Sequence, residues 1–165
     1  MKKVLLIIPA YNEEESIEHT INSIRTFISN NELNFKTDYL VVNDGSKDQT
    51  YQLVRKMNVD VINLRTNLGL SGGFMAGMKY AARHNYDFAI QFDADGQHLP
   101  DYIPAMVEEA EKGANVVIGS RFVTEKRPNS LRMIGNTLIS TAIKITTGQI
   151  VNDPTSGMRL FDKQS

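Results

Sequence analysis

The chain has 165 residues, of which 41% are hydrophobic and 22% charged, as is typical of one soluble globular domain with a substantial core. Its net charge of −1 excludes a strong basic field, so we expect no nucleic-acid partner. Cysteine is absent, which excludes thiol catalysis, thiolate metal sites and disulfides. No apolar run is as long as a transmembrane helix requires.

Short apolar runs alternate with helical patterns along the whole chain. The runs predict strands at residues 4–8, 39–42, 59–64, 88–92, 116–118 and 158–161. Between the first two, Ile17, Ile21, Ile24 and Ile28 recur at helical spacing. Strands that alternate with helices predict a single α/β domain over residues 1–165 with a mainly parallel central sheet.

Polar and small residues set the expected boundaries of these elements. We expect Pro9 to break the first strand, Asn12 to cap the first helix with Glu15 in a capping box, and Asn30-Asn31 to end it. The second helix is expected to start with Ser46 or Asp48 as its cap. A glycine-rich connection at 67–73 is expected to lead into a helix, and the glycines at 69, 72, 73 and 77 are expected to permit close helix–strand packing. The remaining expectations are a helix at 101–112 closed by Gly113, and a helix at 131–145.

Polar loops follow four of the expected strands, at residues 9–13, 44–48, 93–97 and 119–121. The carboxyl ends of parallel strands meet at one edge of a sheet, where open α/β sheets bind their ligands. In the third loop Asp93 and Asp95 lie one residue apart, and Gln97 follows them. Such oxygen ligands suit Mg²⁺ or Mn²⁺ bound against a diphosphate, although a solvated Asp-Gly turn explains this loop alone about as well. Of the three histidines, His19 and His84 are expected at the surface; His98 could face this loop, although a role outside the site is the favoured interpretation.

Three ordered motifs are recognisable: residues 8–14 (IPAYNEE), 42–50 (VNDGSKDQT) and 93–96 (DADG). Together they closely resemble the inverting family 2 glycosyltransferases, which implies the Rossmann-like GT-A fold, a three-layer α/β sandwich. Residues 119–122 (GSRF), Arg132 with Gly135-Asn136, and residues 153–161 (DPTSGMRLF) are similar to the polyprenyl-phosphate branch, typified by dolichol-phosphate mannose synthase. The resemblance covers nearly the whole chain.

The resemblance implies a role for each matching residue. The nucleotide-sugar would be bound by Pro9, Ala10, Tyr11, Asn12, Glu13, Asp44, Asp93 and Ala94. Asp93, Asp95 and Gln97 would hold a divalent cation, Mg²⁺ or Mn²⁺, and Asp95 and Asp153 would be catalytic. Arg121 and Arg132 would receive the acceptor phosphate, although a surface salt bridge is an equally good account of Arg132.

The expected acceptor is a polyprenyl phosphate. A phosphate monoester has a second pKa of about 6, so at neutral pH it is already a nucleophile and needs no general base. No obvious pair of acids lies between Arg121 and Asp153 to act as such a base. Asp153 itself remains open as a base, as a partner that orients Arg159, or as a contact to the donor sugar.

A lipid acceptor predicts a cytoplasmic protein bound peripherally at the inner face of the membrane. Lys126, Arg127 and Arg132 lead into the expected helix at 131–145, as an interfacial helix requires, although packing on the sheet explains its apolar stripe equally well. Because the chain stops directly after an expected strand, we expect a C-terminal truncation, with a missing segment or a membrane-protein partner.

Three other functions stay open. A glycosyltransferase of the same family can instead transfer sugar to a saccharide hydroxyl in cell-wall or surface polysaccharide. The chain can also be a non-catalytic fragment that binds nucleotide-sugar. An Asp-x-Asp phosphohydrolase with Asp93 as nucleophile is disfavoured, because it leaves the Pro9 and Asp44 loops unexplained and has Gln97 two residues after Asp95.

Overall fold

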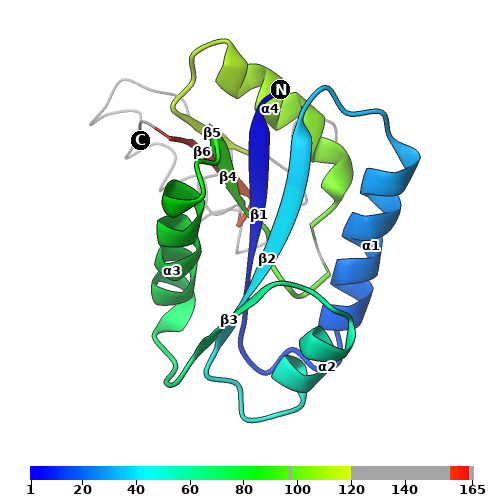
Figure 1. The fold of residues 1–165 in the computed structure, drawn as a ribbon, viewed down its shortest axis with the longest axis vertical. Helices are drawn as coiled ribbons and strands as arrows, with labels where there is room; N and C mark the ends of the chain where they lie inside the picture. The colour runs from blue at the N-terminus through cyan, green and yellow to red at the C-terminus, as the bar shows by residue number, and fades with distance from the viewer. Residues whose placement is uncertain (97, 120–156, 164–165) are drawn as a thin grey trace, which may run out of the picture.

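A computed structural model describes residues 1–96, 98–119 and 157–163 of the chain (Figure 1). Its elements in chain order are β1 (Lys3–Ala10), α1 (Ile17–Asn30), β2 (Lys36–Asp44), α2 (Thr50–Lys56), β3 (Val61–Leu64), α3 (Gly69–Arg83), β4 (Phe88–Gln91), the 3₁₀ turn η1 (Pro100–Tyr102), α4 (Ile103–Glu111), β5 (Val116–Ile118) and β6 (Arg159–Asp162). The expected helix at 131–145 lies outside the described residues. No described helix has both the length and the apolar character needed to cross a bilayer.

The strands form one mixed sheet in the order β3-β2-β1-β4-β6-β5. β3, β2, β1 and β4 are parallel, while β6 runs antiparallel to both β4 and β5. The expectation of a mainly parallel sheet is therefore confirmed. The edge at which β1 to β4 end is called the carboxyl edge below, and the edge at which they begin is called the amino edge.

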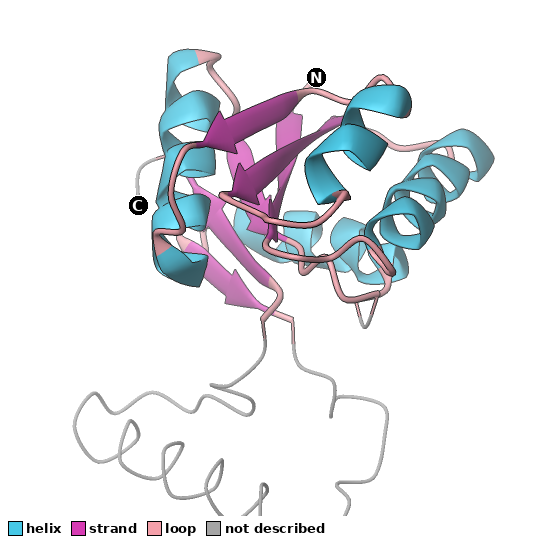
Figure 2. Cartoon of the chain, turned by 90° about the horizontal axis from the view of Figure 1, so that it is seen from below, coloured by secondary structure: helices cyan, strands magenta, loops and turns pink. Residues whose placement is uncertain are grey.

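Helices cover both faces of the sheet and give three layers (Figures 1 and 2). One core lies between the sheet and α1, α2 and α4; it includes Leu6, Ile21, Val54 and Val107. The other lies between the sheet and α3; it includes Leu5, Ile7, Val42 and Ala81. Adjacent β1 residues belong to different cores because successive side chains of a strand point to opposite faces. This explains why residues 4–8 are uniformly aliphatic.

Pro9 does not break the first strand as expected, because β1 continues through it to Ala10. The β1 residues that face β4 are Lys3 and Ile7, whose carbonyls accept hydrogen bonds from Asp87 N and Phe92 N. By the two-residue repeat of a strand, Pro9 faces the same way, beyond the last β4 pairing at Gln91. Its missing N–H therefore costs no ladder hydrogen bond.

Helix α1 begins later than expected, at Ile17 with Ser16 as its N-cap, so the Asn12 cap and the Glu15 capping box were wrong. Asn12 has a φ of 55° and uses its side chain in the loop instead. The other end agrees with the sequence: α1 stops at Asn30, and Asn31 Nδ2 donates to Phe27 O over 2.8 Å. Gly113 likewise follows α4 with a φ of 104°.

The glycine-rich segment is mostly helix rather than connection, since α3 begins at Gly69. Its expected packing role is confirmed at Gly77, where an added Cβ would overlap the Ile7 side chain. At Gly73 a Cβ would make ordinary contacts with Pro9 and Asp44, at 3.6 and 3.8 Å. Helix α3 therefore packs closely against the ends of β1 and β2.

Candidate functional site

The loops after β1 and β2 interlock at the carboxyl edge. Five hydrogen bonds join them: Asn12 N to Ser46 Oγ (3.0 Å), Glu13 N to Thr50 Oγ1 (2.8 Å), Glu14 N to Asp48 Oδ2 (3.1 Å), Lys47 N to Asn12 Oδ1 (2.8 Å) and Gln49 N to Glu14 Oε2 (2.9 Å). Two of the predicted nucleotide-binding segments are thus built as one unit.

Asp48 anchors this unit to α2. Its Oδ1 accepts from both Thr50 N, at 3.0 Å, and Thr50 Oγ1, at 2.6 Å. The N-cap of α2 is Gln49, so the expectation of Ser46 or Asp48 at that position was wrong. Asp48 still accepts from the first helical amide, whereas Ser46 is bonded to Asn12. Burial raises the pKa of Asp48, but the hydrogen bonds from Thr50 and Glu14 outweigh it and leave the pKa below its ordinary value.

Asp44 ends β2 and is only 3% exposed. Its Oδ1 accepts a hydrogen bond from Leu68 N over 2.8 Å, directly before α3. The side chain therefore fastens the start of α3 rather than its own Gly45-Ser46 turn. A buried carboxylate has several acceptor positions, so Asp44 keeps the capacity to accept a further donor at the carboxyl edge.

The Asp93 loop follows β4 with alternating burial. Phe92 and Ala94 are buried, while the Asp93 side chain is 28% exposed and Asp95 is exposed. Gln91 Nε2 donates to Asp93 Oδ1 over 3.3 Å. The core thus takes the two apolar residues and leaves both carboxylates at the surface of the carboxyl edge.

His98 closes this loop on itself. Its Nδ1 accepts from Asp93 N over 2.9 Å, and its Nε2 lies 3.3 Å from Asp93 Oδ2. The ring packs edge-on against Phe92 with centroids 5.4 Å apart. His98 therefore belongs to the site, while His19 and His84 are exposed, as expected.

Two contacts at this loop were not foreseen from the sequence. A Cβ on Gly157 would overlap Asp93 Oδ2 and lie 3.0 Å from His98 Cε1, so only glycine allows the segment before β6 to approach there. Thr20 Oγ1 of α1 donates to Ala94 O over 2.9 Å. Thr20 and Gly157 are both distant in sequence from the Asp93 loop. The sequence offered only a threonine on the apolar side of the first expected helix and a glycine before the last expected strand.

The carboxylates fit a divalent cation that is shared with a ligand. Asp93 and Asp95 offer hard oxygens, and glycine at position 157 lets the segment before β6 lie against Asp93 Oδ2 without the overlap that a Cβ would cause. Within the described part of the chain, no three His, Cys, Asp or Glu side chains gather closely enough to hold an ion on their own. The remaining ligands must come from elsewhere. Gln97, Arg121, Arg132 and Asp153, which were also predicted as site residues, lie outside the described residues.

The glycosyl transferase family 2 model matches residues 5–165, which is almost the whole chain. The chain belongs to this family. Similar proteins include a UDP-N-acetylglucosamine–dolichyl-phosphate N-acetylglucosaminyltransferase from Methanococcus voltae, 31% identical over 99% of this chain and 71% of that protein. An undecaprenyl-phosphate mannosyltransferase from Micrococcus luteus is 34% identical over 96% of this chain and 66% of that protein. The predicted resemblance to polyprenyl-phosphate sugar transferases is therefore confirmed.

Solved structures agree on the fold. Glucosyl-3-phosphoglycerate synthase from Mycobacterium tuberculosis, in complex with Mn²⁺, UDP and glucosyl-3-phosphoglycerate, superposes with a TM-score of 0.74 at 17% identity, over 99% of this chain and 57% of that chain. The expected GT-A fold is confirmed.

A dolichol-phosphate mannosyltransferase from Pyrococcus furiosus is 32% identical, and the chain covers 47% of its length. The chain thus spans between about half and about seven tenths of the length of these relatives.

Proposed function

We propose that this family 2 glycosyltransferase domain transfers a sugar, with inversion, from a nucleoside diphosphate to a polyprenyl phosphate. The observation that carries the proposal is the meeting of two acidic groups at the carboxyl edge: buried Asp44 beside the interlocked loops, and the Asp93–Asp95 pair after β4. One suits a nucleoside and the other a diphosphate with its cation. The names of the relatives support the lipid-phosphate acceptor.

Each end of the donor has a partner in this arrangement. Asp44 accepts a hydrogen bond from an N–H of the base, while Pro9, Ala10, Tyr11, Asn12 and Glu13 line the nucleoside. Asp93 and Asp95 face the diphosphate and, with Gln97, are ligands of Mg²⁺ or Mn²⁺. Ala94, which was also expected to contact the donor, has its side chain in the core and so contributes no side-chain contact. When bound, the ion neutralises the charge that builds on the departing nucleoside diphosphate.

The acceptor side rests on residues known only from the sequence. Arg121 and Arg132 bind the acceptor phosphate, whose oxygen attacks the anomeric carbon as the bond to the diphosphate breaks on the opposite face. Because the phosphate is already ionised, this step needs positioning rather than proton abstraction. Asp153 then orients the sugar or Arg159; as a base it would be needed only for a hydroxyl acceptor.

The test begins with the melting temperature in the presence of UDP, GDP, CDP and dTDP, each with Mn²⁺, Mg²⁺ or EDTA. A ligand that binds only the folded state raises the melting temperature, so one base with a divalent cation should stand out. The matching donor sugars are then offered to a short-chain polyprenyl phosphate and to the same polyprenol without phosphate. Transfer to the phosphate alone supports the proposal. Transfer only to a saccharide, or binding without transfer to any acceptor, contradicts it.

A lipid acceptor also requires access to the bilayer, so we place the protein peripherally at the cytoplasmic face of the membrane. Lys126, Arg127 and Arg132 carry this expectation, each adding about 1 kcal/mol near anionic lipid. Sedimentation with anionic liposomes should show binding that weakens with salt and is lost when the three charges are reversed. Reversal of the exposed residues Arg55, Lys56 and Lys79 is a charge-matched control. Absence of binding at low salt would contradict this placement.

A further inference from the structure

Ala94, the residue between the two carboxylates, is held in place through both its backbone carbonyl and its side chain. Thr20 Oγ1 donates to Ala94 O over 2.9 Å, and the two residues are 1% and 3% exposed. The Ala94 side chain belongs to the core beneath α1, together with Ile17 and Ile21. The hydrogen bond thus ties Ala94 to α1, and the burial of its methyl group in this core restricts the residue further.

This attachment bears directly on the geometry of the carboxylates. The Ala94 carbonyl is part of the peptide that leads into Asp95, so rotation of that peptide would move Asp95 relative to Asp93. A buried carbonyl without a donor is costly, and the Thr20 hydroxyl therefore favours one orientation of the peptide.

Helix α1 also packs against the end of the turn. Gly96 has a φ of 75°, which favours glycine. A Cβ built on Gly96 would lie 3.6 Å from His19 Cδ2 and 4.0 Å from Thr20 Oγ1. Two adjacent α1 residues thus border the turn that carries Asp93 and Asp95. Since α1 follows the interlocked loop at residues 9–13, one helix connects the nucleoside side of the site with the carboxylate pair.

We propose that Thr20 is a positioning residue that sets the relative orientation of Asp93 and Asp95 for a divalent cation bound with a nucleoside diphosphate. The inference rests on the proposed function, because it concerns the same carboxylates. Thr20 touches neither the ion nor the donor. Its contribution is transmitted through the Ala94 carbonyl, and it acts on the affinity for the ion rather than on the nucleoside.

The test measures Mn²⁺ binding to the full chain in the presence of saturating UDP and, separately, saturating GDP. Binding is monitored through the electron paramagnetic resonance signal of the free Mn²⁺. Thr20→Val keeps the shape and removes the donor, and Thr20→Ala removes the donor without crowding the turn. Both should weaken Mn²⁺ binding by about tenfold, the lower end of the range for residues that hold metal ligands in place. Thr20→Ser keeps the hydroxyl and should restore the affinity. Nucleotide binding in EDTA should be the same in all variants.

Thr37→Val is the matched control, because Thr37 Oγ1 is also buried but has no hydrogen-bond partner among the residues that the structure describes, and Thr37 lies near the amino edge. It should leave Mn²⁺ binding unchanged. A purely structural role for Thr20 would lower the melting temperature while the folded protein kept wild-type Mn²⁺ affinity, and this result would overturn the inference. Equal losses in Thr20→Ser or Thr37→Val would also overturn it. If the wild-type chain binds both diphosphates equally with and without Mn²⁺, the proposed function itself fails.

Discussion

Strands β2 and β4 each have an acidic residue at or near both ends, and the partners of these acids differ between the amino and carboxyl edges of the sheet. At the amino edge, the acid of β2 and the acid before β4 are each paired with a lysine: Lys36 Nζ lies 3.2 Å from Asp38 Oδ2, and Lys2 Nζ lies 3.5 Å from Asp87 Oδ1. At the carboxyl edge, the partners of Asp44 and Asp93 among the described residues are a backbone N–H group, a side-chain amide and His98. In the described part of the chain, no lysine or arginine pairs with either of them.

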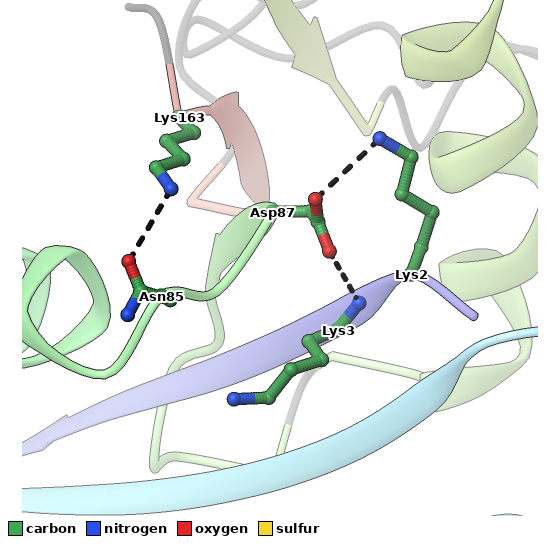
Figure 3. Close-up of polar contacts among 5 residues, drawn as sticks. All are labelled: Lys2, Lys3, Asn85, Asp87 and Lys163. Carbon is green, nitrogen blue, oxygen red and sulfur yellow. Dashed lines mark hydrogen bonds and ion pairs between the residues drawn. The ribbon is translucent and has the colours of Figure 1, made fainter.

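The amino-edge acids also have further donors of their own. Asp87 Oδ2 accepts from Lys3 N over 2.8 Å, and nearby Lys163 Nζ donates to Asn85 Oδ1, so the start of β1, the start of β4 and the end of β6 meet there (Figure 3). Tyr86 Oη donates to Asp38 Oδ2 over 3.0 Å, and burial together with this bond raises the pKa of Tyr86.

The presence or absence of a lysine partner distinguishes an acid that stabilises the fold from an acid that can bind a ligand. Where the protein supplies the cation, the charge is compensated in the free molecule and contributes to folding. Where it does not, the carboxylate is available for a hydrogen-bond donor or a cation that arrives with a ligand. Substitutions at the two edges should therefore affect different properties, and the following predictions are ordered from the largest expected effect to the smallest.

The largest effect is expected at Asp95. Asp95→Ala removes one of two carboxylates from the ion and should reduce sugar transfer by at least about 100-fold, the scale of losing one electrostatic partner of the departing group. The exposed side chain contributes little to the core, so the melting temperature should stay close to wild type. Turnover with the chosen donor and thermal melting are the two measurements. Asp95→Ala with unchanged turnover would mean that the carboxyl-edge pair does not serve the reaction.

Sequence patterns were sufficient to predict which strands meet at this edge. Apolar runs alternating with helices imply parallel strands, and parallel strands bring Asp44 and Asp93 to one edge without any further information. Local patterns were less reliable at Pro9 and Asn12. There the end of the neighbouring β4 and the adjacent β2 loop, rather than intrinsic propensity, decide the conformation.

The supports of the site were not predictable. Thr20 and Ala94 are 74 residues apart, and Gly157 and Asp93 are also distant, so no local spacing reveals either contact. A buried threonine on a helix is most simply read as a satisfied core residue, and a glycine as a turn. Only the three-dimensional arrangement shows that both border the carboxylates.

The second effect concerns Asp44. Asp44→Ala should weaken binding of the preferred nucleoside by about 1–3 kcal/mol, because a buried donor on the base would lose its acceptor. Asp44→Asn keeps the size and one acceptor oxygen, so a smaller loss is expected. Calorimetry with the nucleoside, which lacks the diphosphate and needs no metal, isolates this end of the site.

The Asp44 substitution needs a control for α3, since the same carboxylate accepts from Leu68 N. Asn67→Ala removes the neighbouring bond from Gly69 N to Asn67 Oδ1 and loosens the same turn without touching Asp44. Asn67→Ala should weaken nucleoside binding less than Asp44→Ala does. Equal losses in the two variants would assign Asp44 to the start of α3 rather than to the base.

The smallest effect is expected at the amino edge. Burial raises the pKa of Asp87, but the bond from Lys3 N and the charges of Lys2 and Lys163 outweigh it, so the pKa lies below the ordinary value of 3.8. A carboxyl whose pKa is lower in the folded state stabilises the fold above the unfolded pKa, and this contribution is lost as the pH falls through the folded pKa.

Asp87→Asn should therefore lower the free energy of unfolding by about 1 kcal/mol at pH 7, with much of the charge effect screened at this partly exposed site. Urea unfolding at pH 7, 5, 4 and 3 should show the difference from wild type shrinking below pH 4, while nucleotide and Mn²⁺ binding stay unchanged at pH 7. Glu108→Gln, which removes one of the two carboxylate partners of exposed Lys112, is the matched control and should change stability very little. A loss of nucleotide affinity in Asp87→Asn would contradict the division of roles, because it would make an amino-edge acid serve the carboxyl-edge site.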